Sequence, residues 1–174
     1  MSKALFVIDM LRAFLEPGRP LFCGESARAI VPFVTAKVRE FSEAGETIYF
    51  VCDSHDPNDA EFERFPPHAI RGTEEARLIE ELEPFAEDGL FVYKRRFSAF
   101  FETPLDEMLA AGRPDLAEVV GVCTNICVLY TVEELRNRDI PVRVHRGGVA
   151  GFDEKAHEWA LSEMEKVLGA EIAD

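Results

Sequence analysis

Apolar segments typical of strands alternate with amphipathic segments typical of helices along nearly the whole chain, and no other feature constrains the fold as much. The expected strands cover residues 4–9, 46–53, 90–94, 116–122, 141–145 and 170–172, and the expected helices cover 26–45, 73–83, 103–112, 125–138 and 153–169. The strands are apolar on both faces, which is typical of a parallel sheet that helices cover on both sides. We therefore predict an α/β fold, a three-layer sandwich around a mostly parallel sheet of five or six strands.

Local signals predict where several helices begin and end. Pro32 lies inside residues 26–45 and predicts a turn or a bend there, whereas Gly45 ends that segment. Thr103, Thr124 and Asp153 each stand before a helical segment, where a side-chain oxygen can cap the first turn.

Length and charge limit the classes of function. The chain has 174 residues, which we interpret as one domain over 1–174. A net charge of −14 argues against nucleic acid and against anionic membranes as partners. No apolar run reaches the about 18 residues that a membrane span needs, and the N-terminus lacks the pattern of a signal peptide. Four cysteines without an export signal predict reduced thiols in a cytoplasmic protein.

One long irregular stretch, residues 54–72, interrupts the alternation. A loop of this length inside a compact domain is usually functional. Ligands of open α/β sheets bind beyond the carboxyl ends of the strands. The residues at those ends are therefore the candidates for a site: Asp9, Asp53, Lys94 and the segment 122–127.

Three of these positions together favour nucleophilic catalysis. Asp9 ends an apolar strand, where poor hydration raises the pKa of a carboxyl and suits it to accept a proton, although it could simply cap a turn. Lys94 could pair with such a carboxylate or be a surface charge. Cys127 lies in the expected first turn of a helix, which would lower the pKa of its thiol, although free cysteines are often buried as small apolar side chains. A thiol, a base and a cation are what thiol catalysis requires.

A second set of side chains has the composition of a metal site. Asp53 and His55 are two residues apart in an extended segment, so both can point to one side. His68 follows later in the loop, with Glu61 and Glu63 between. Imidazoles and carboxylates suit zinc, iron or manganese, but each histidine alone could be an ordinary loop residue.

Three short motifs of the chain resemble those of the isochorismatase-like cysteine hydrolase superfamily, and within it those of the nicotinamidases (pyrazinamidases). The resemblance rests on VID ending at Asp9, on K-x-x-F-S-A-F at 94–100 and on GVCTNICV at 121–128. It implies an isochorismatase-like, Rossmann-type fold and a catalytic triad of Asp9, Lys94 and Cys127. It also implies a cis peptide bond before Cys123, which would aim the backbone N–H groups of Cys123 and Cys127 at an oxyanion.

The resemblance further implies a cofactor and a substrate pocket. The pattern D-S-H-(x)12-H implies a divalent metal ion, with zinc as the first candidate and iron or manganese as alternatives. Its ligands would be Asp53, His55, His68 and Glu61, with Glu63 in place of Glu61 as the alternative. In this family the metal binds the pyridine nitrogen of the substrate. Aromatic side chains that flank the ring there match Phe14, Phe65 and Phe97, which could also be ordinary core residues.

The implied function is hydrolysis of nicotinamide to nicotinate and ammonia through a thioester, a reaction of NAD salvage. A first alternative is a related amidase for another small amide or carbamoyl compound; an isochorismate hydrolase has no need of the metal set. A second alternative is a non-catalytic domain that binds a metal or a ligand. The resemblance also leads us to expect a homo-oligomer, without indicating its interface.

Overall fold

The computed structural model describes residues 1–174 and contains one six-stranded sheet in which all paired strands are parallel. The strands are β1 (Lys3–Ile8), β2 (Thr47–Asp53), β3 (Leu90–Lys94), β4 (Leu116–Val122), β5 (Val142–Ala150) and β6 (Glu171–Ala173). Their order in the sheet is β3-β2-β1-β4-β5-β6. The predicted α/β fold is confirmed, with six strands.

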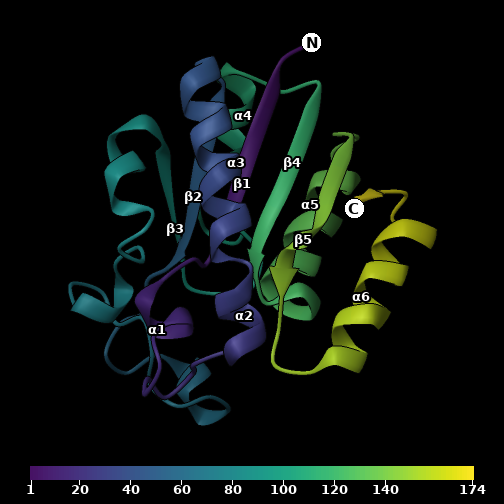
Figure 1. Ribbon diagram of the computed structural model, residues 1–174. Coiled ribbons are helices and arrows are strands. Elements are labelled where there is room, and N and C mark those ends of the chain that lie inside the picture. The colour runs from purple at the N-terminus through teal and green to yellow at the C-terminus, as the bar shows by residue number, and fades with distance from the viewer.

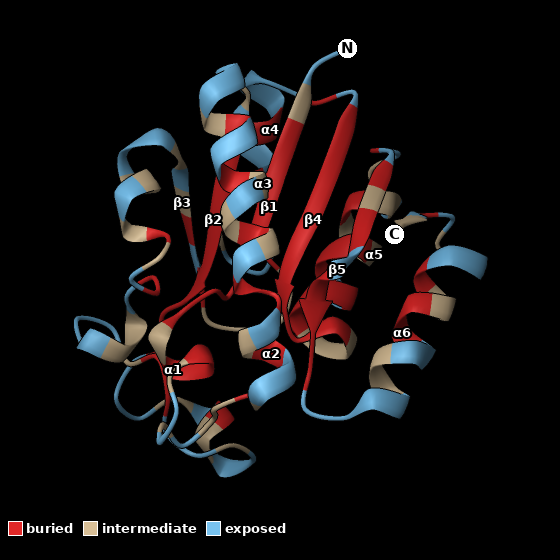
Figure 2. Ribbon diagram, viewed as in Figure 1, coloured by how far each residue is buried: buried red, intermediate tan, exposed pale blue.

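Helices cover both faces of this sheet, which makes three layers (Figure 1). One face carries α1 (Arg12–Leu15), α2 (Glu25–Ala29) and α3 (Val31–Ala44); the other carries α4 (Leu105–Ala111), α5 (Leu129–Asn137) and α6 (Glu154–Lys166). Successive side chains of a strand point to opposite faces, so Phe6 and Ile8 pack under α4–α6 whereas Leu5 and Val7 pack under α3. Figure 2 shows the central strands buried between the layers, with the outer surfaces of the helices exposed. None of these helices is long and apolar enough to cross a membrane.

The strand order reverses between β1 and β4, the point where ligands bind in sheets of this kind. The chain leaves β1 toward β2 on one side, and β4 continues toward β5 on the other. Gly121 near the end of β4 has φ +124°, and a Cβ there would lie only 2.0 Å from the carbonyl oxygen of Ile8. Glycine thus lets β4 and β1 approach closely at the ends that carry the candidate residues.

The expected helix at 73–83 is wrong. This segment forms a short 3-10 turn at Glu74–Ala76, a short extended stretch through Leu78 and Ile79, a turn at 80–82 and then another 3-10 segment, Glu83–Asp88. Its backbone pairs with the segment after β1: Leu78 forms an antiparallel bridge with Leu11, and the Ile79 N–H donates to the Met10 carbonyl over 3.1 Å. Tertiary backbone pairing and burial of Leu78 and Ile79 therefore outweigh the helical spacing of the sequence.

Helix boundaries agree with the sequence except in details. The segment 26–45 is broken at Ile30, so Pro32 stands in the first turn of α3, and Gly45 ends that helix in the left-handed conformation. Asp153 caps α6 as expected, since its carboxylate accepts a hydrogen bond from the Ala156 N–H over 2.7 Å. At α4 the cap position is Pro104, one residue later than expected, although the Thr103 hydroxyl still accepts from the Leu105 N–H over 3.3 Å. The sequence did not predict α1.

Candidate active site

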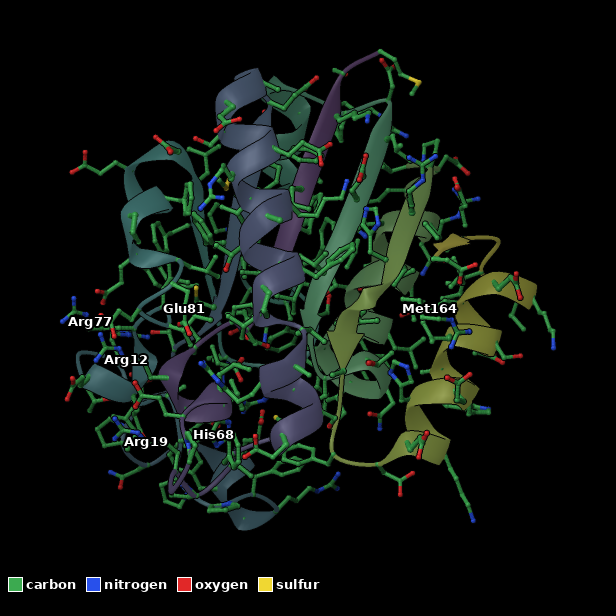
Figure 3. The ribbon with its side chains drawn as sticks, in the orientation of Figure 1. Arg12, Arg19, His68, Arg77, Glu81 and Met164 are labelled. Atoms are coloured by element: carbon green, nitrogen blue, oxygen red, sulfur yellow. The ribbon has the colours of Figure 1, made fainter.

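A cavity opens beyond the carboxyl ends of the central strands. Its polar wall consists of Asp9, Asp53, Glu61, His68, Cys123 and Cys127, and its apolar wall consists of Phe14, Leu21, Phe65, Phe97, Val122, Ile126 and Phe152. Figure 3 shows His68 near α1, on the side of the molecule toward which the strands point. Residues from the ends of three strands and from the loop 54–72 therefore meet in one place, as the sequence predicts for a site.

Asp9 is the first residue after β1 and is buried, with a left-handed φ of 51°. This conformation turns the chain out of the strand, and few residues other than glycine, asparagine and aspartate adopt it readily. Its Oδ1 accepts a hydrogen bond from the Asp53 N–H over 2.8 Å, and its Oδ2 lies 2.9 Å from Lys94 Nζ. Burial and the nearby Asp53 carboxylate raise the pKa of Asp9 to about 6, with Lys94 opposing them.

Lys94 ends β3 and is the only cation among the buried side chains at the strand ends. Its Nζ binds Asp53 Oδ1 and lies 2.9 Å from Asp9 Oδ2 and 3.5 Å from Cys127 Sγ. Burial alone would lower the pKa of Lys94, but Asp53 and Asp9 outweigh it and raise that pKa well above its usual range. The ammonium therefore stays charged, and the two carboxylates and the thiol all contact it.

Cys127 lies in a single π-helical turn, Thr124–Val128, that precedes α5. Thr124 does not cap this turn: Cys123 takes the cap position, and the Thr124 hydroxyl lies 2.8 Å from Nδ1 of His157 in α6. π-Turns of this kind are frequent at functional sites. Cys127 is buried, and its sulfur faces Lys94.

The expected lowering of the Cys127 pKa is wrong. Burial raises the pKa of this thiol well above its ordinary value, and Asp9 and Asp53 raise it further against the opposing effect of Lys94. A helix N-terminus stabilises a nearby anion by only about 0.3–1 kcal/mol in most settings. Two carboxylates and a dry environment outweigh an effect of that size, so the resting sulfur is a protonated thiol.

Asp53 joins the thiol half of the cavity to the histidine half. Its Oδ1 binds Lys94, whereas its Oδ2 lies 3.6 Å from His55 Nε2 and 3.7 Å from His68 Nε2. Burial would raise the pKa of Asp53, but Lys94 and the two histidines lower it overall. Asp53 is thus a carboxylate whose two oxygens face different partners.

The histidine half has the donor geometry of a metal site. Ligand atoms of Asp53, His55 and His68 lie within 4.8 Å of one another. In both rings Nδ1 is engaged elsewhere, with the Asp59 carboxylate at 3.2 Å from His55 and the Pro66 carbonyl at 2.8 Å from His68. Nε2 of His55 is buried without a hydrogen-bond partner. An unpartnered imidazole nitrogen beside a carboxylate is what a divalent ion requires, so these residues fit the implied metal.

Glu61, and not Glu63, turns toward this set. Glu61 Oε1 lies 3.9 Å from His68 Nε2, and its Oε2 is buried without a hydrogen-bond partner, whereas Glu63 is exposed. Burial and Asp53 raise the pKa of Glu61, an effect that a bound cation would offset. The geometry therefore favours Glu61 as the fourth candidate ligand.

Sequence reasoning missed two residues that hold this set in place. The buried Asp59 carboxylate contacts His55 Nδ1, accepts from the Glu61 N–H over 2.9 Å and lies 2.7 Å from Nη1 of Arg96. Arg96 stands two residues after Lys94, so it connects the end of β3 to the loop. The only sequence signal was the position of Asp59 between two candidate ligands.

Aromatic side chains close the cavity. Phe14 lies edge-on to His68 with ring centroids 5.5 Å apart, and Phe65 lies edge-on to Phe97 at 6.4 Å. All three line the cavity, as the resemblance implies. Leu21, Ile126 and Phe152 also line it and were not predicted. The apolar walls and the polar base together suit a flat, mostly apolar ring that carries one polar group.

The peptide bond between Val122 and Cys123 is cis, as the resemblance implies. The Cys123 N–H donates no hydrogen bond within the protein. It is therefore free to donate to a ligand beside Cys127.

Comparisons with known proteins agree with this geometry. The Isochorismatase domain family matches residues 3–174. The crystal structure of the nicotinamidase/pyrazinamidase PncA of Bacillus subtilis is similar over 100% of both chains, with a TM-score of 0.95 and 36% identity. The pyrazinamidase of Pyrococcus horikoshii in complex with zinc is similar over 100% of this chain and 99% of that one, with a TM-score of 0.91 and 29% identity. A probable inactive nicotinamidase of Arabidopsis thaliana is 30% identical over 95% of this chain and 89% of that protein.

Proposed function

This chain belongs to the isochorismatase family as a nicotinamidase/pyrazinamidase-like amide hydrolase, and we propose that it converts nicotinamide to nicotinate and ammonia. The observation that carries the proposal is the contact of Lys94 with Asp9, Asp53 and Cys127 at once. In the proposed reaction these side chains are the base, the cation and the thiol, and a metal-type donor set lies beside them. A binding domain would gain nothing from a buried thiol held next to a base.

Asp9 is the proposed general base. Its pKa of about 6 leaves it mostly ionised at neutral pH and also able to hold a proton for a short time. Because the pKa of Cys127 is raised, the thiol proton moves to Asp9 only as the sulfur attacks the amide carbonyl. Lys94 stays charged and stabilises the anionic charge that passes between sulfur and carboxylate.

The attack forms a carbon–sulfur bond and places negative charge on the carbonyl oxygen. The backbone N–H groups of Cys123 and Cys127 are the proposed donors to that oxygen, and one such donor contributes on the order of 10²–10³ in rate. Asp9 then returns its proton to the amide nitrogen, the carbon–nitrogen bond breaks and ammonia leaves. Water, deprotonated by Asp9, hydrolyses the thioester and releases nicotinate and the Cys127 thiol.

Residues at the end of the cavity away from Cys127 orient the substrate. A divalent ion held by Asp53, His55, His68 and Glu61 would supply a Lewis-acidic contact for the ring nitrogen. Phe14, Phe65 and Phe97 exclude water and confine the ring between their faces and edges. The carboxamide is then directed toward Cys127. Zinc is the first candidate, because the similar pyrazinamidase of Pyrococcus horikoshii is in complex with zinc.

The decisive experiment measures ammonia release from nicotinamide, pyrazinamide and a set of carbamoyl compounds, with metal present and after chelation. We expect nicotinamide to give the highest kcat/KM, chelation to abolish turnover and added metal to restore it. Full activity in the presence of chelator would refute the metal-dependent reaction. A preference for a carbamoyl compound would identify the alternative amidase instead, and no turnover of any amide by metal-loaded protein would favour the binding domain.

A further inference from the structure

Two buried cysteines outside the triad face each other beside the cavity. Cys23 Sγ and Cys123 Sγ lie 3.4 Å apart, although the residues are 100 positions apart in the sequence. Both are free thiols with 2% and 5% of their surface exposed. The proposed reaction uses only the backbone of Cys123, so neither sulfur has a task in it.

The pair connects two parts of the cavity wall: the irregular segment 16–24 between α1 and α2, here called the mouth segment, and the turn that follows β4. Cys23 lies near the end of the mouth segment, and its N–H donates to the Phe14 carbonyl over 2.8 Å. Leu21 in the same segment lines the cavity. Cys123 follows β4 and also lines the cavity, so a small molecule that enters there reaches this residue. A covalent bond between the two sulfurs would fix the mouth segment to the turn that carries Cys127.

We propose that Cys23 and Cys123 form an oxidation site, where a small peroxide converts the two thiols to a disulfide that restrains the mouth of the cavity. One thiol loses its proton and the thiolate attacks an oxygen of hydrogen peroxide; the oxygen–oxygen bond breaks, a sulfenic acid forms, and the departing hydroxide takes up the thiol proton to become water. The second thiol then loses its proton and attacks the sulfenic sulfur; the sulfur–oxygen bond breaks, and the departing hydroxide takes up this proton as the second water. With hydrogen peroxide the sum is two thiols and one peroxide to one disulfide and two waters.

Geometry favours this pair over the other thiols. A disulfide needs sulfurs about 2.05 Å apart, so closure requires a relative movement of little more than 1 Å. The hydrogen bond with Cys23 and burial both raise the pKa of the Cys123 thiol, which lowers its thiolate fraction at neutral pH and makes its oxidation slow. Cys52 provides the contrast, because its sulfur contacts only the Phe50 carbonyl, at 3.6 Å.

The effect on turnover rests on the proposed function. Drawing Cys123 toward Cys23 shifts the N–H that faces the oxyanion, and a misplacement of about 1 Å in a catalytic group lowers a rate by up to about 10²-fold. We expect oxidation to lower kcat/KM for nicotinamide by at least about tenfold, and a dithiol reductant to restore it.

The experiment treats metal-loaded protein with hydrogen peroxide or with the thiol oxidant diamide and maps the cross-link by mass spectrometry. The Cys127→Ala background removes oxidation of the nucleophile. We expect a Cys23–Cys123 peptide pair and a mass loss of two hydrogens, both reversed by reductant. They should be unchanged in Cys52→Ala and absent from Cys23→Ala and Cys23→Ser.

Two outcomes overturn the inference: no cross-link after prolonged oxidation of folded protein, or a cross-link that persists in both Cys23 variants. The effect on turnover is tested in proteins that retain Cys127. Diamide treatment should lower the activity of wild type more than that of Cys23→Ser. If both lose the same activity and reductant restores both, the effect on turnover is overturned. The mapping does not depend on activity. A cross-link in a protein that hydrolyses no amide would therefore refute the proposed function and leave the oxidation site standing.

Discussion

The backbone N–H of Asp53 donates a hydrogen bond to Oδ1 of Asp9 over 2.8 Å, which joins the proposed metal ligand to the proposed base. Lys94 reinforces this link because its ammonium contacts both carboxylates. The two halves of the site therefore share one buried ionic cluster. A substitution of either carboxylate should therefore affect both the thiol half and the histidine half of the cavity.

The first prediction is an acid limb in the pH profile. The pKa of Asp9 is raised to about 6, so the carboxylate that accepts the thiol proton is lost as the pH falls through that value. We expect kcat/KM to fall by about tenfold per pH unit below 6. Steady-state assays from pH 5 to 8 with metal held saturating test this, and a flat profile over that range would exclude Asp9 as the base.

Neither Asp9 nor Asp53 causes unfolding over this limb. A carboxyl whose pKa is raised on folding binds its proton more tightly in the folded state, so Asp9 favours the folded state more as the pH falls from 8 to 4. The pKa of Asp53 is lowered, so its stabilising contribution is complete above the unfolded value of about 3.9 and declines only below it. Circular dichroism should therefore show a folded protein throughout the pH range of the assay.

The candidate site was predictable from sequence where it lies at the ends of regular strands. A run of apolar residues that stops at an acid or a lysine identifies a strand end, and parallel strands bring such ends together. Asp9, Asp53 and Lys94 were found by this reasoning. Their register, with Asp53 opposite Lys94, then follows from the pairing of β2 with β3.

Features that depend on contacts between distant segments were not predictable. The spacing of residues 73–83 is helical, but the backbone there pairs with residues 10–12 instead. The raised pKa of Cys127 needs the positions of both carboxylates, which sequence spacing does not contain. Asp59 and Arg96 likewise meet only because the loop 54–72 folds back against the end of β3.

Removing the Lys94 ammonium should destabilise the protein and abolish turnover. Lys94→Met leaves two buried carboxylates without their shared cation, and breaking a buried ion pair in this way typically lowers the free energy of unfolding by about 3–5 kcal/mol. Urea unfolding of chelator-treated protein measures the effect. Lys155→Met at the exposed start of α6 is the control and should change stability by no more than about 0.5 kcal/mol. Equal stabilities of the two variants would contradict the ionic cluster.

Cys127→Ala should remove amide hydrolysis while the fold survives. The substitution deletes the sulfur that forms the thioester, and no other thiol lies against Lys94. Ammonia release should fall to the uncatalysed level, with nicotinamide still protecting the metal-loaded variant against thermal unfolding. Cys52→Ala, which also removes a buried thiol, should keep its activity. Measurable turnover by Cys127→Ala would assign the nucleophile elsewhere.

Phe97→Ala should weaken substrate binding more than the chemical step. Phe97 lines the cavity and packs edge-on against Phe65, and its apolar ring supplies no group that forms or breaks a bond in the proposed reaction. Loss of one aromatic contact corresponds to roughly 0.5–1.5 kcal/mol beyond the lost area, so KM should rise several-fold with a smaller change in kcat. Phe101→Ala is the control: Phe101 lies in the same segment after β3 but is exposed, so the substitution should leave KM unchanged. A fall in kcat alone would assign Phe97 a different role.

Asp59→Asn should weaken metal binding although Asp59 is no ligand itself. The Asp59 carboxylate fixes the ring of His55 through Nδ1, accepts from the Glu61 N–H and holds Arg96 in place. Loss of such an outer partner typically lowers metal affinity by about 10–100-fold. Competition for zinc with a chromogenic chelator measures this without reference to turnover. Asp56→Asn is the matched control, because Asp56 is exposed and its side chain only approaches Arg71, at 3.6 Å.

An amide at position 59 can still accept a hydrogen bond from His55, but it carries no charge for Arg96. Asp59→Ala, which loses both contacts, should therefore weaken zinc binding further than Asp59→Asn. Unchanged zinc affinity in both Asp59 variants would show that His55 and Glu61 hold their positions without it.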